Sequence, residues 1–268
     1  MTLQVLPSSA WREFRGFPGL RGLNQTSHFA LVEGSGGKLH KCFLKLIDPS
    51  TPGLLCEALG WAVAQGASVP TAEFACIVFV PVDELKKHVA LPSWLTGLSE
   101  APAWCTEVIT GDSVAQVHKW LYAIRRKRCL NSIDTHAIAA FDVWSDNADR
   151  HMGNVMRSSS GGYVAIDHET LLHEMLWIPS GRRYTVQRLV DAGKTFLGKS
   201  AFKTFFSNMH DAAGTHNGAM KSVEKDIRDI VATVVDPVHA LPLANAIVSY
   251  LGARSAPSWF PANVGVTA

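Results

Sequence analysis

The stretch that decides the fold covers residues 141–169 and reads FDVWSDNADRHMGNVMRSSSGGYVAIDHE. A dense polar cluster comes first, followed by a short apolar pair at 155–156, turn residues, and a second short apolar run at 163–166. Two short β-type runs joined by a Ser- and Gly-rich turn predict a hairpin, which Asn154 enters and Asp167 leaves. Since these two strand ends lie side by side, the Asn154 amide oxygen and the Asp167 carboxylate are expected to converge on one point.

Amide and carboxylate oxygens are donors that a hard cation such as Mg²⁺ accepts, while waters and phosphates complete its octahedron. Asp149 precedes Asn154 by five residues, on the loop that enters the hairpin, where it can orient or deprotonate a hydroxyl nucleophile. Phosphoryl transfer requires one carboxylate for the attacking group, and an Asn and an Asp for the metal. An Asp-Arg-His triplet alone is usually a capping or salt-bridge cluster, but its combination with Asn154 and Asp167 favours the catalytic interpretation.

A lysine within an apolar strand indicates where phosphates are anchored. Lys45 lies in the run KCFLKLI, residues 41–47, and burying a lysine is costly unless it is paired. Glu57, on the helix predicted to follow, is the natural partner, and a strand Lys paired with a helix Glu is how kinases position the phosphates. Taken alone, Lys45 is more simply an exposed residue of a half-buried strand, so this interpretation depends on the downstream hairpin.

Two glycine-containing segments compete as the phosphate loop. The GSGG turn, residues 34–37, joins the first two predicted strands and so lies at the far end of their hairpin. Residues 22–27, GLNQTS, precede the first of those strands, and their backbone N–H groups and the side chains of Gln25, Thr26 and Ser27 can bind phosphate oxygens. We predict the second segment as the phosphate loop, with an ordinary turn as the alternative, because no G-x-G-x-x-G or Walker motif occurs.

The pattern along the chain changes from strands to helices near residue 109. Short β-type runs at 28–33, 41–47, 73–82 and 104–110 surround one helical stretch at 53–65, with 92–102 as a loop. Beyond Gly111, residues 113–128 and 132–144 are predicted helices, the second capped by Ser132, and further helical stretches follow between 184 and 251. This order predicts an α+β fold with a β-rich N-lobe, residues 1–109, and a helical C-lobe, residues 110–268.

Composition narrows the class of protein. Of the 268 residues, 47% are apolar and 18% are charged, which provides for a packed core and excludes a disordered chain. The net charge of +2 is too small to indicate a nucleic-acid or membrane partner. Five cysteines without a C-x-x-C pair indicate neither a zinc site nor a disulfide framework. With no signal peptide and no apolar stretch of membrane-spanning length, a cytoplasmic protein is expected.

Residues 147–154, NADRHMGN, resemble the N-x-D-R-H-x-x-N signature of HipA-like kinases, and Ile166-Asp167-His168 is similar to the metal-binding Asp segment of that family. Phosphatidylinositol-kinase-like enzymes share the D-R-H-x-x-N core. The stretch from Leu55 to Pro70 is similar to the family's helix, in which a Glu precedes a G-x-x-V/I-P turn. The resemblance covers about residues 22–169, and it implies a compact, two-lobed protein-kinase-like fold.

The resemblance also implies a role for each matching residue. Asp149 is the expected catalytic aspartate, and Asn154 and Asp167 are the expected Mg²⁺ ligands. The backbone of Glu107 and Val108 is expected to meet the adenine ring. The expected nucleotide-binding residues are together Gln25, Thr26, Ser27, His28, Lys45, Glu57, Glu107 and Val108. The residues expected to support the loop around the aspartate are Asn147, Arg150 and His151.

The sequence departs from the family pattern at two points, and both concern which molecule the expected kinase modifies. Glu169 stands where the family commonly has a glycine within two positions of the metal-binding Asp, and the chain has no room for the family's extra N-terminal subdomain. The resemblance implies a kinase that uses ATP and Mg²⁺ to modify a protein Ser or Thr. It also suggests a toxin with a DNA-binding antitoxin as partner. From the small net charge and the lack of a membrane-spanning stretch, no direct contact with nucleic acid or membrane is expected.

Three alternatives stay open at this point. The first is a catalytically silent nucleotide-binding module of the same fold with a regulatory role. The second is a kinase that acts on a lipid or a small-molecule hydroxyl. The third is a metal-dependent phosphohydrolase whose ligands fall at helical spacing, although no His-Asp doublet supports it. Its candidate ligands are His136, Asp142, Asp146 and Asp149.

Overall fold

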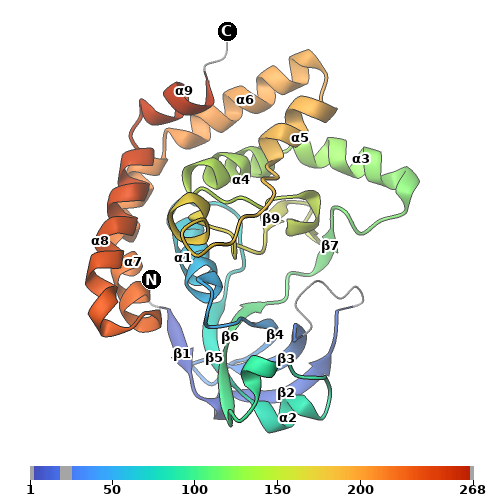
Figure 1. The fold of residues 1–268 in the computed structure, drawn as a ribbon. Coiled ribbons are helices and arrows are strands. Elements are labelled where there is room, and N and C mark those ends of the chain that lie inside the picture. The colour runs from blue at the N-terminus through green and yellow to red at the C-terminus, as the bar shows by residue number, and fades with distance from the viewer. Residues whose placement is uncertain (1–2, 19–25, 266–268) are drawn as a thin grey trace. The chain divides into compact units, whose positions relative to one another are not determined.

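The computed structural model describes residues 3–18 and 26–265 (Figure 1). The chain divides into two compact units. Met1–Leu54 and Ala72–Val108 form the first, and Leu55–Thr71 and Ile109–Ala268 form the second. The first unit is built around a β-sheet and the second is mainly helical, which confirms the predicted α+β class with strands first and helices later.

A six-stranded sheet forms the first unit, in the order β1-β5-β6-β4-β3-β2. Its strands are β1 (Gln4–Leu6), β2 (Trp11–Gly16), β3 (His28–Glu33), β4 (Leu39–Leu46), β5 (Ala75–Pro81) and β6 (Glu100–Glu107). β1 runs parallel to β5, and the other pairs are antiparallel. Every second residue of β3 is buried, as expected for a strand with one face on a core. That core includes Val32, Leu44, Val78 and, from the short helix α2 (Val82–Lys86), Leu85.

The strands predicted at 28–33, 41–47 and 73–82 are confirmed as β3, β4 and β5, whereas β1 and β2 have no counterpart in the prediction. The predicted loop at 92–102 is wrong at its end, because β6 starts at Glu100 and includes Pro102 opposite Phe79. Proline is tolerated there because β4 pairs with β6 only from Ala103 onward, so Pro102 takes no position in that ladder.

Helices and a three-stranded sheet make up the second unit. The helices are α1 (Gly53–Gly66), α3 (Lys119–Leu130), α4 (Ile133–Trp144), α5 (Leu189–Phe196), α6 (Lys199–Ala213), α7 (His216–Val234), α8 (Pro237–Arg254) and α9 (Trp259–Val264). The sheet has the order β7-β8-β9, with β7 (Gly111–Ser113), β8 (Val155–Ser158) and β9 (Tyr163–Ala165). Within residues 3–18 and 26–265, no helix combines the length and the apolar character needed to span a bilayer.

Helix α4 sets the position of the polar loop that follows it. Most of its residues are buried, and it packs against α6 and β9. Ser132 is its N-cap residue, as predicted, but the Ser132 hydroxyl makes no capping bond. Asp134 in the first turn instead accepts a 2.9 Å hydrogen bond from the backbone N–H of Tyr163, which ties the start of α4 to β9. The helix ends at Trp144, directly before the polar cluster.

The predicted helix at 113–128 begins too early, since Ser113 ends β7 and α3 starts only at Lys119. β7 pairs with β8, so that Gly111 lies opposite Ser158. Gly111 has a φ of +151°, and a Cβ there would lie 2.0 Å from the carbonyl oxygen of Arg157. Only glycine permits this conformation and this close approach of two backbones. The strand therefore forms through long-range pairing that the local pattern does not reveal.

The division of the chain also differs from the predicted lobes, because the helix expected in the N-lobe belongs from Leu55 onward to the second unit. α1 packs against the segment after β9. Cys56 Sγ donates to the carbonyl oxygen of Leu171 over 3.1 Å, and a Cβ on Gly60 would lie 2.2 Å from the Cβ of His168. These contacts join residues more than a hundred positions apart. They explain why α1 belongs to the second unit, although it directly follows β4 of the first unit in the sequence.

Candidate active site

A buried arginine holds the loop after α4 in place. Arg150 is fully buried, and its Nε lies 3.1 Å from both carboxylate oxygens of Asp142 on α4. Its Nη1 donates to the carbonyl oxygen of Asn154 (3.1 Å) and to that of Ile166. Its Nη2 lies 3.0 Å from Nδ1 of His168. One guanidinium thus joins α4 to both ends of the hairpin, and its buried charge is tolerated because it is paired and fully hydrogen-bonded.

The backbone of Asp149 is fixed on three sides. Its N–H donates to Thr170 Oγ1 (3.0 Å), and that hydroxyl donates to Asn147 Oδ1 (2.6 Å). Its carbonyl oxygen accepts from Asn154 Nδ2 (2.9 Å). The backbone of Gln187 pairs with the residues on either side of it. These bonds determine where the Asp149 side chain begins and limit where its carboxylate can point.

The Asp149 carboxylate has an oxygen available for a ligand. The side chain is 30% exposed, yet Oδ1 is buried and has no hydrogen-bond partner among the described residues. His151 Nε2 lies 4.0 Å from it, beyond hydrogen-bond distance. Burial raises the pKa of Asp149, His151 opposes the rise, and the Asp167 carboxylate adds to it. Because an unsatisfied buried acceptor costs free energy, this oxygen is suited to accept a hydrogen bond from a bound hydroxyl.

The predicted hairpin is present, and its two ends meet. β8 and β9 pair Val155 with Ala165, and the N–H of Ile166 donates to the carbonyl oxygen of Asn154 (3.1 Å). Because Asn154 Nδ2 is bound to the backbone of the preceding loop, its Oδ1 is the amide atom left for a ligand. Asp167 follows with a φ of +63°, a left-handed conformation that is unfavourable for a non-glycine residue and is found at functional sites.

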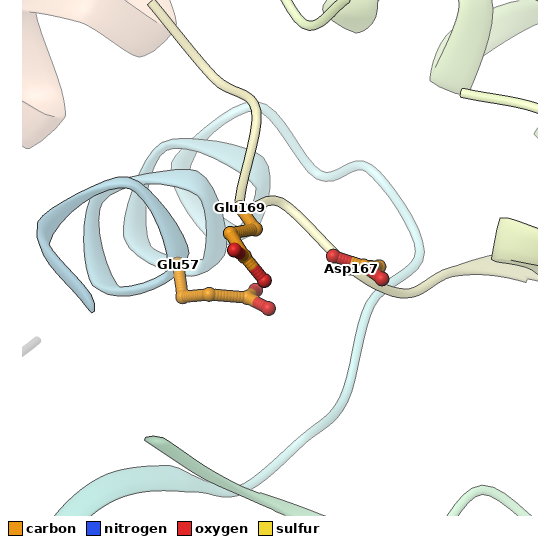
Figure 2. Close-up of side chains that lie close together, drawn as sticks. All are labelled: Glu57, Asp167 and Glu169. Carbon is orange, nitrogen blue, oxygen red and sulfur yellow. The ribbon is translucent and has the colours of Figure 1, made fainter. Parts of the chain in front are cut away.

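Three carboxylates gather at this end of the hairpin (Figure 2). Glu57 on α1, together with Asp167 and Glu169, forms a group whose ligand oxygens all lie within 4.8 Å of one another, which we call the carboxylate cluster. Glu57 is buried, and its Oε2 accepts a 2.8 Å hydrogen bond from the N–H of His168, between the other two. A donor set of oxygens suits a hard divalent cation such as Mg²⁺ or Mn²⁺. The residues present therefore fit the metal that phosphoryl transfer uses.

Glu169 is the residue that sequence reasoning missed, since the family pattern marks it only as a departure. The available signal is its spacing of two residues from Asp167, which in extended chain brings two side chains to the same side. Glu57 is expected from the sequence to hold Lys45 of the first unit. Within the second unit it holds the backbone at His168, which sequence proximity does not predict.

Part of the predicted phosphate loop serves the packing of the first unit. Gln25 lies outside the described residues. Thr26 Oγ1 donates to the carbonyl oxygen of Leu46 (3.3 Å). The two ring nitrogens of His28 contact the carbonyl oxygen of Thr26 (2.8 Å) and Nε1 of Trp11 (3.2 Å), and burial lowers its pKa. Because both ring nitrogens are engaged, the His28 side chain packs β2 against β3, and the nucleotide contact predicted at His28 has to use other atoms of this residue.

The other expected nucleotide contacts of the first unit lie on β4 and at the end of β6. Lys45 is half-buried on β4, between residues that face the apolar core, so its own side chain is on the opposite face of the sheet. Ser27 is buried directly before β3. The N–H groups of Glu107 and Val108 donate to carbonyl oxygens of residues 74 and 41, each over 2.9 Å. An adenine contact at Glu107 and Val108 therefore has to use groups other than these two N–H donors.

The phosphohydrolase alternative fails on geometry. Both ring nitrogens of His136 are hydrogen-bonded, to a backbone carbonyl and to an asparagine amide, each at 3.0 Å. Asp142 is paired with Arg150, and Asp146 Oδ2 accepts from the N–H of Glu174 (2.7 Å). In the part of the chain that the structure describes, the carboxylate cluster is the one His, Cys, Asp or Glu group that can hold a metal.

The crystal structure of a Helicobacter pylori proinflammatory kinase, CtkA, is similar to this chain with a TM-score of 0.50 and 11% identity, over 93% of this chain and 98% of that one. The fold is kinase-like. The FAT and kinase domain of CtTel1 also matches, at a TM-score of 0.40 and 11% identity, over 86% of this chain and 20% of that one. No protein-family model and no curated protein matches the sequence. The likeness establishes the fold, and the roles of the residues rest on this chain's own geometry.

Proposed function

We propose that the chain is an ATP- and Mg²⁺-dependent kinase that transfers the γ-phosphate to a protein Ser or Thr, as in the HipA-like kinases that its loop resembles. One observation carries this proposal. The unpartnered, buried Oδ1 of Asp149 lies on a loop that is hydrogen-bonded to Asn154, at the hairpin end where Asp167 and the carboxylate cluster lie. The kinase-like fold supports the same class of reaction.

Asp149 is the proposed catalytic residue of the loop at 145–154, which we call the catalytic loop. Its Oδ1 accepts the hydrogen bond of the acceptor hydroxyl and orients that oxygen for attack. The hydroxyl oxygen forms a bond to the γ-phosphorus while the bond to the β–γ bridging oxygen breaks, ADP leaves, and the hydroxyl proton passes to Asp149. His151 supports the loop, since its Nδ1 accepts from the N–H of Gly153 (2.8 Å).

Asn154 Oδ1 and the Asp167 carboxylate are the proposed ligands of the divalent ion, and Glu169 lies close enough to Asp167 to join them. The ion, when bound, neutralises phosphate charge during transfer. Arg150 keeps the ligands in place, because its Nη1 donates to the carbonyl oxygens of Asn154 (3.1 Å) and Asp167 (3.2 Å). For the first unit, we propose that Lys45 contacts the phosphates of the nucleotide.

The experiment that tests the proposal is transfer of labelled phosphate by the purified full chain. The chain is incubated with γ-labelled ATP, Mg²⁺ and a cell lysate, and the labelled species are identified. We expect label on protein with the wild type and none with Asp149→Ala, while both bind ATP in titration calorimetry. Asp211→Asn removes an exposed acid from α6 and should transfer phosphate like the wild type.

Three other results have distinct meanings. Metal-dependent ATP binding without transfer to any acceptor, including the chain itself, would indicate the silent regulatory module. Label on a lipid or a small molecule, but not on protein, would keep the kinase and change its acceptor. Full transfer by Asp149→Ala would show that the assignment of the catalytic residue is wrong.

A further inference from the structure

The chain that leaves the carboxylate cluster returns to the catalytic loop at Gln187. The N–H of Gln187 donates to the carbonyl oxygen of Ala148 (2.7 Å), and its carbonyl oxygen accepts from the N–H of Arg150 (2.8 Å). Gln187 is therefore paired on both sides of Asp149. Residues 182–186, which precede it, belong to neither helix nor strand. A molecule bound along these residues lies close to the proposed catalytic carboxylate.

Two further hydrogen bonds hold this segment. The N–H of Arg182 donates to the carbonyl oxygen of Trp177 (3.1 Å), and the N–H of Tyr184 donates to Nε2 of His173 (3.2 Å). The Tyr184 ring also packs edge-on against the Trp177 indole, with 5.0 Å between the ring centroids. Since these points fix the segment before any ligand binds, binding has less conformational entropy to remove.

Between the fixed points the backbone is open. In the hydrogen-bond network of residues 3–18 and 26–265, the backbone groups of Arg183, Thr185 and Val186 take no part. All three residues are exposed. Exposed, unpaired N–H and C=O groups are what an extended peptide pairs with when it docks on a protein. A lipid headgroup or a small alcohol offers no such row of groups, so this feature favours a polypeptide acceptor.

The segment carries two adjacent arginines. Arg182 and Arg183 are exposed, and among the described residues neither guanidinium forms an ion pair with a carboxylate. Burial and the charge of Glu169 raise the pKa of the Tyr184 phenol, and the positive charge of Arg182 opposes the rise. A guanidinium binds a carboxylate through two parallel hydrogen bonds, which suits recognition of acidic side chains.

We propose that residues 182–186 are the docking site of the acceptor polypeptide, and that Arg182 and Arg183 select a Ser or Thr flanked by Asp or Glu. This inference rests on the proposed kinase function and adds the substrate class to it. The acceptor pairs with the open backbone, its acidic side chains bind the two guanidinium groups, and its hydroxyl reaches Asp149. Arg188 is not part of this surface, because it is already paired with Asp146 (3.2 Å).

Three peptides of equal length, each with one central Ser, test the proposal. They differ only in flanks of Asp and Glu, of Gln, or of Lys and Arg, and kcat/KM is measured with the full chain, ATP and Mg²⁺. We expect the acidic peptide to be preferred over the basic one by about tenfold, the scale of charge-assisted contacts. In the R182E/R183E variant this preference should invert, which a folding defect cannot produce. Lys221→Glu makes the same kind of charge change on α7 and should keep the wild-type preference.

The remaining outcomes separate this proposal from the proposed function. Equal kcat/KM for the three peptides, or an acidic preference that survives the double charge reversal, would overturn the docking proposal and leave the kinase intact. Phosphorylation of phosphatidylinositol vesicles, with no peptide modified, would overturn it in favour of a lipid acceptor. If the wild type transfers phosphate to nothing and matches Asp149→Ala, the proposed function fails, and the docking proposal fails with it.

Discussion

At the scale of single residues, Asp149 meets two opposing demands. Catalysis needs an ionised carboxylate in a partly buried place, whereas burial and the nearby Asp167 disfavour ionisation and raise its pKa. The folded chain therefore binds the Asp149 proton more tightly than the unfolded chain does. Above the folded-state pKa the ionised carboxylate costs stability, and below the ordinary value of 3.8 both states are protonated and the cost disappears.

We therefore expect Asp149→Asn to raise the unfolding temperature at neutral pH, because the amide has the same shape and no charge to desolvate. The gain should shrink as the pH is lowered towards about 4, where the wild-type carboxyl also becomes neutral. Thermal denaturation of both proteins across this pH range measures the effect, and phosphate transfer by the variant should be lost. A variant that is less stable than the wild type at neutral pH would contradict the reasoning.

Arg150 stabilises the folded chain, in contrast to Asp149. Its buried charge is paired with Asp142, and its other N–H groups are hydrogen-bonded. In Arg150→Met the carboxylate of Asp142 stays buried without its cation, and the hydrogen bonds to the hairpin are lost. We expect the free energy of unfolding to fall by about 3–5 kcal/mol, as for other broken buried pairs. Urea denaturation measures this loss. The matched control is Arg228→Met, which breaks an exposed pair with Glu224 on α7 and should cost about 0.5 kcal/mol; equal losses would refute the argument.

At the scale of elements, the β7-β8-β9 sheet depends on one glycine. A Cβ at Gly111 would lie 2.0 Å from a backbone oxygen of β8, at a φ of +151°. We expect Gly111→Ala to lower the free energy of unfolding by at least about 1–3 kcal/mol, the range for strained backbone. A Cβ at Gly218 on α7 would meet no atom within 4 Å, so Gly218→Ala should gain about 0.5–1 kcal/mol. Urea denaturation compares the two, and a neutral Gly111→Ala would mean that β7 does not pair as described.

Elements with local signals were predictable from the sequence, and those held by distant contacts were not. The turn residues between two short apolar runs predict the β8–β9 hairpin, and Ser132 marks the start of α4. By contrast, the carboxylate cluster depends on α1 bringing Glu57 to the N–H of His168, 111 positions along the chain. The pairing of Gln187 with the catalytic loop has no local signal either. Such contacts are made by packing, which one sequence does not encode in any short window.

At the scale of the whole molecule, the proposed function gives Lys45 a direct role in nucleotide binding, and gives Asn154 and Asp167 a role through the metal. Lys45 belongs to the first unit, and Asn154 and Asp167 belong to the second. In the proposal, Lys45 attracts the phosphate charge of the nucleotide directly, whereas Asn154 and Asp167 act through the metal ion. Nucleotide binding with and without the metal can therefore separate their contributions.

We expect ATP with Mg²⁺ to raise the unfolding temperature, because a ligand that binds only the folded chain stabilises it by about 2.7 kcal/mol at a hundred times its Kd. Asp167→Asn should reduce this rise when Mg²⁺ is present and should match the wild type when ATP is added with a chelator. Lys45→Ala should reduce the rise under both conditions, since its charge acts on the phosphates without the metal. Asp211→Asn, an exposed site on α6, should behave as the wild type throughout. If Asp167→Asn weakens the response equally with and without Mg²⁺, its side chain does not act as a metal ligand.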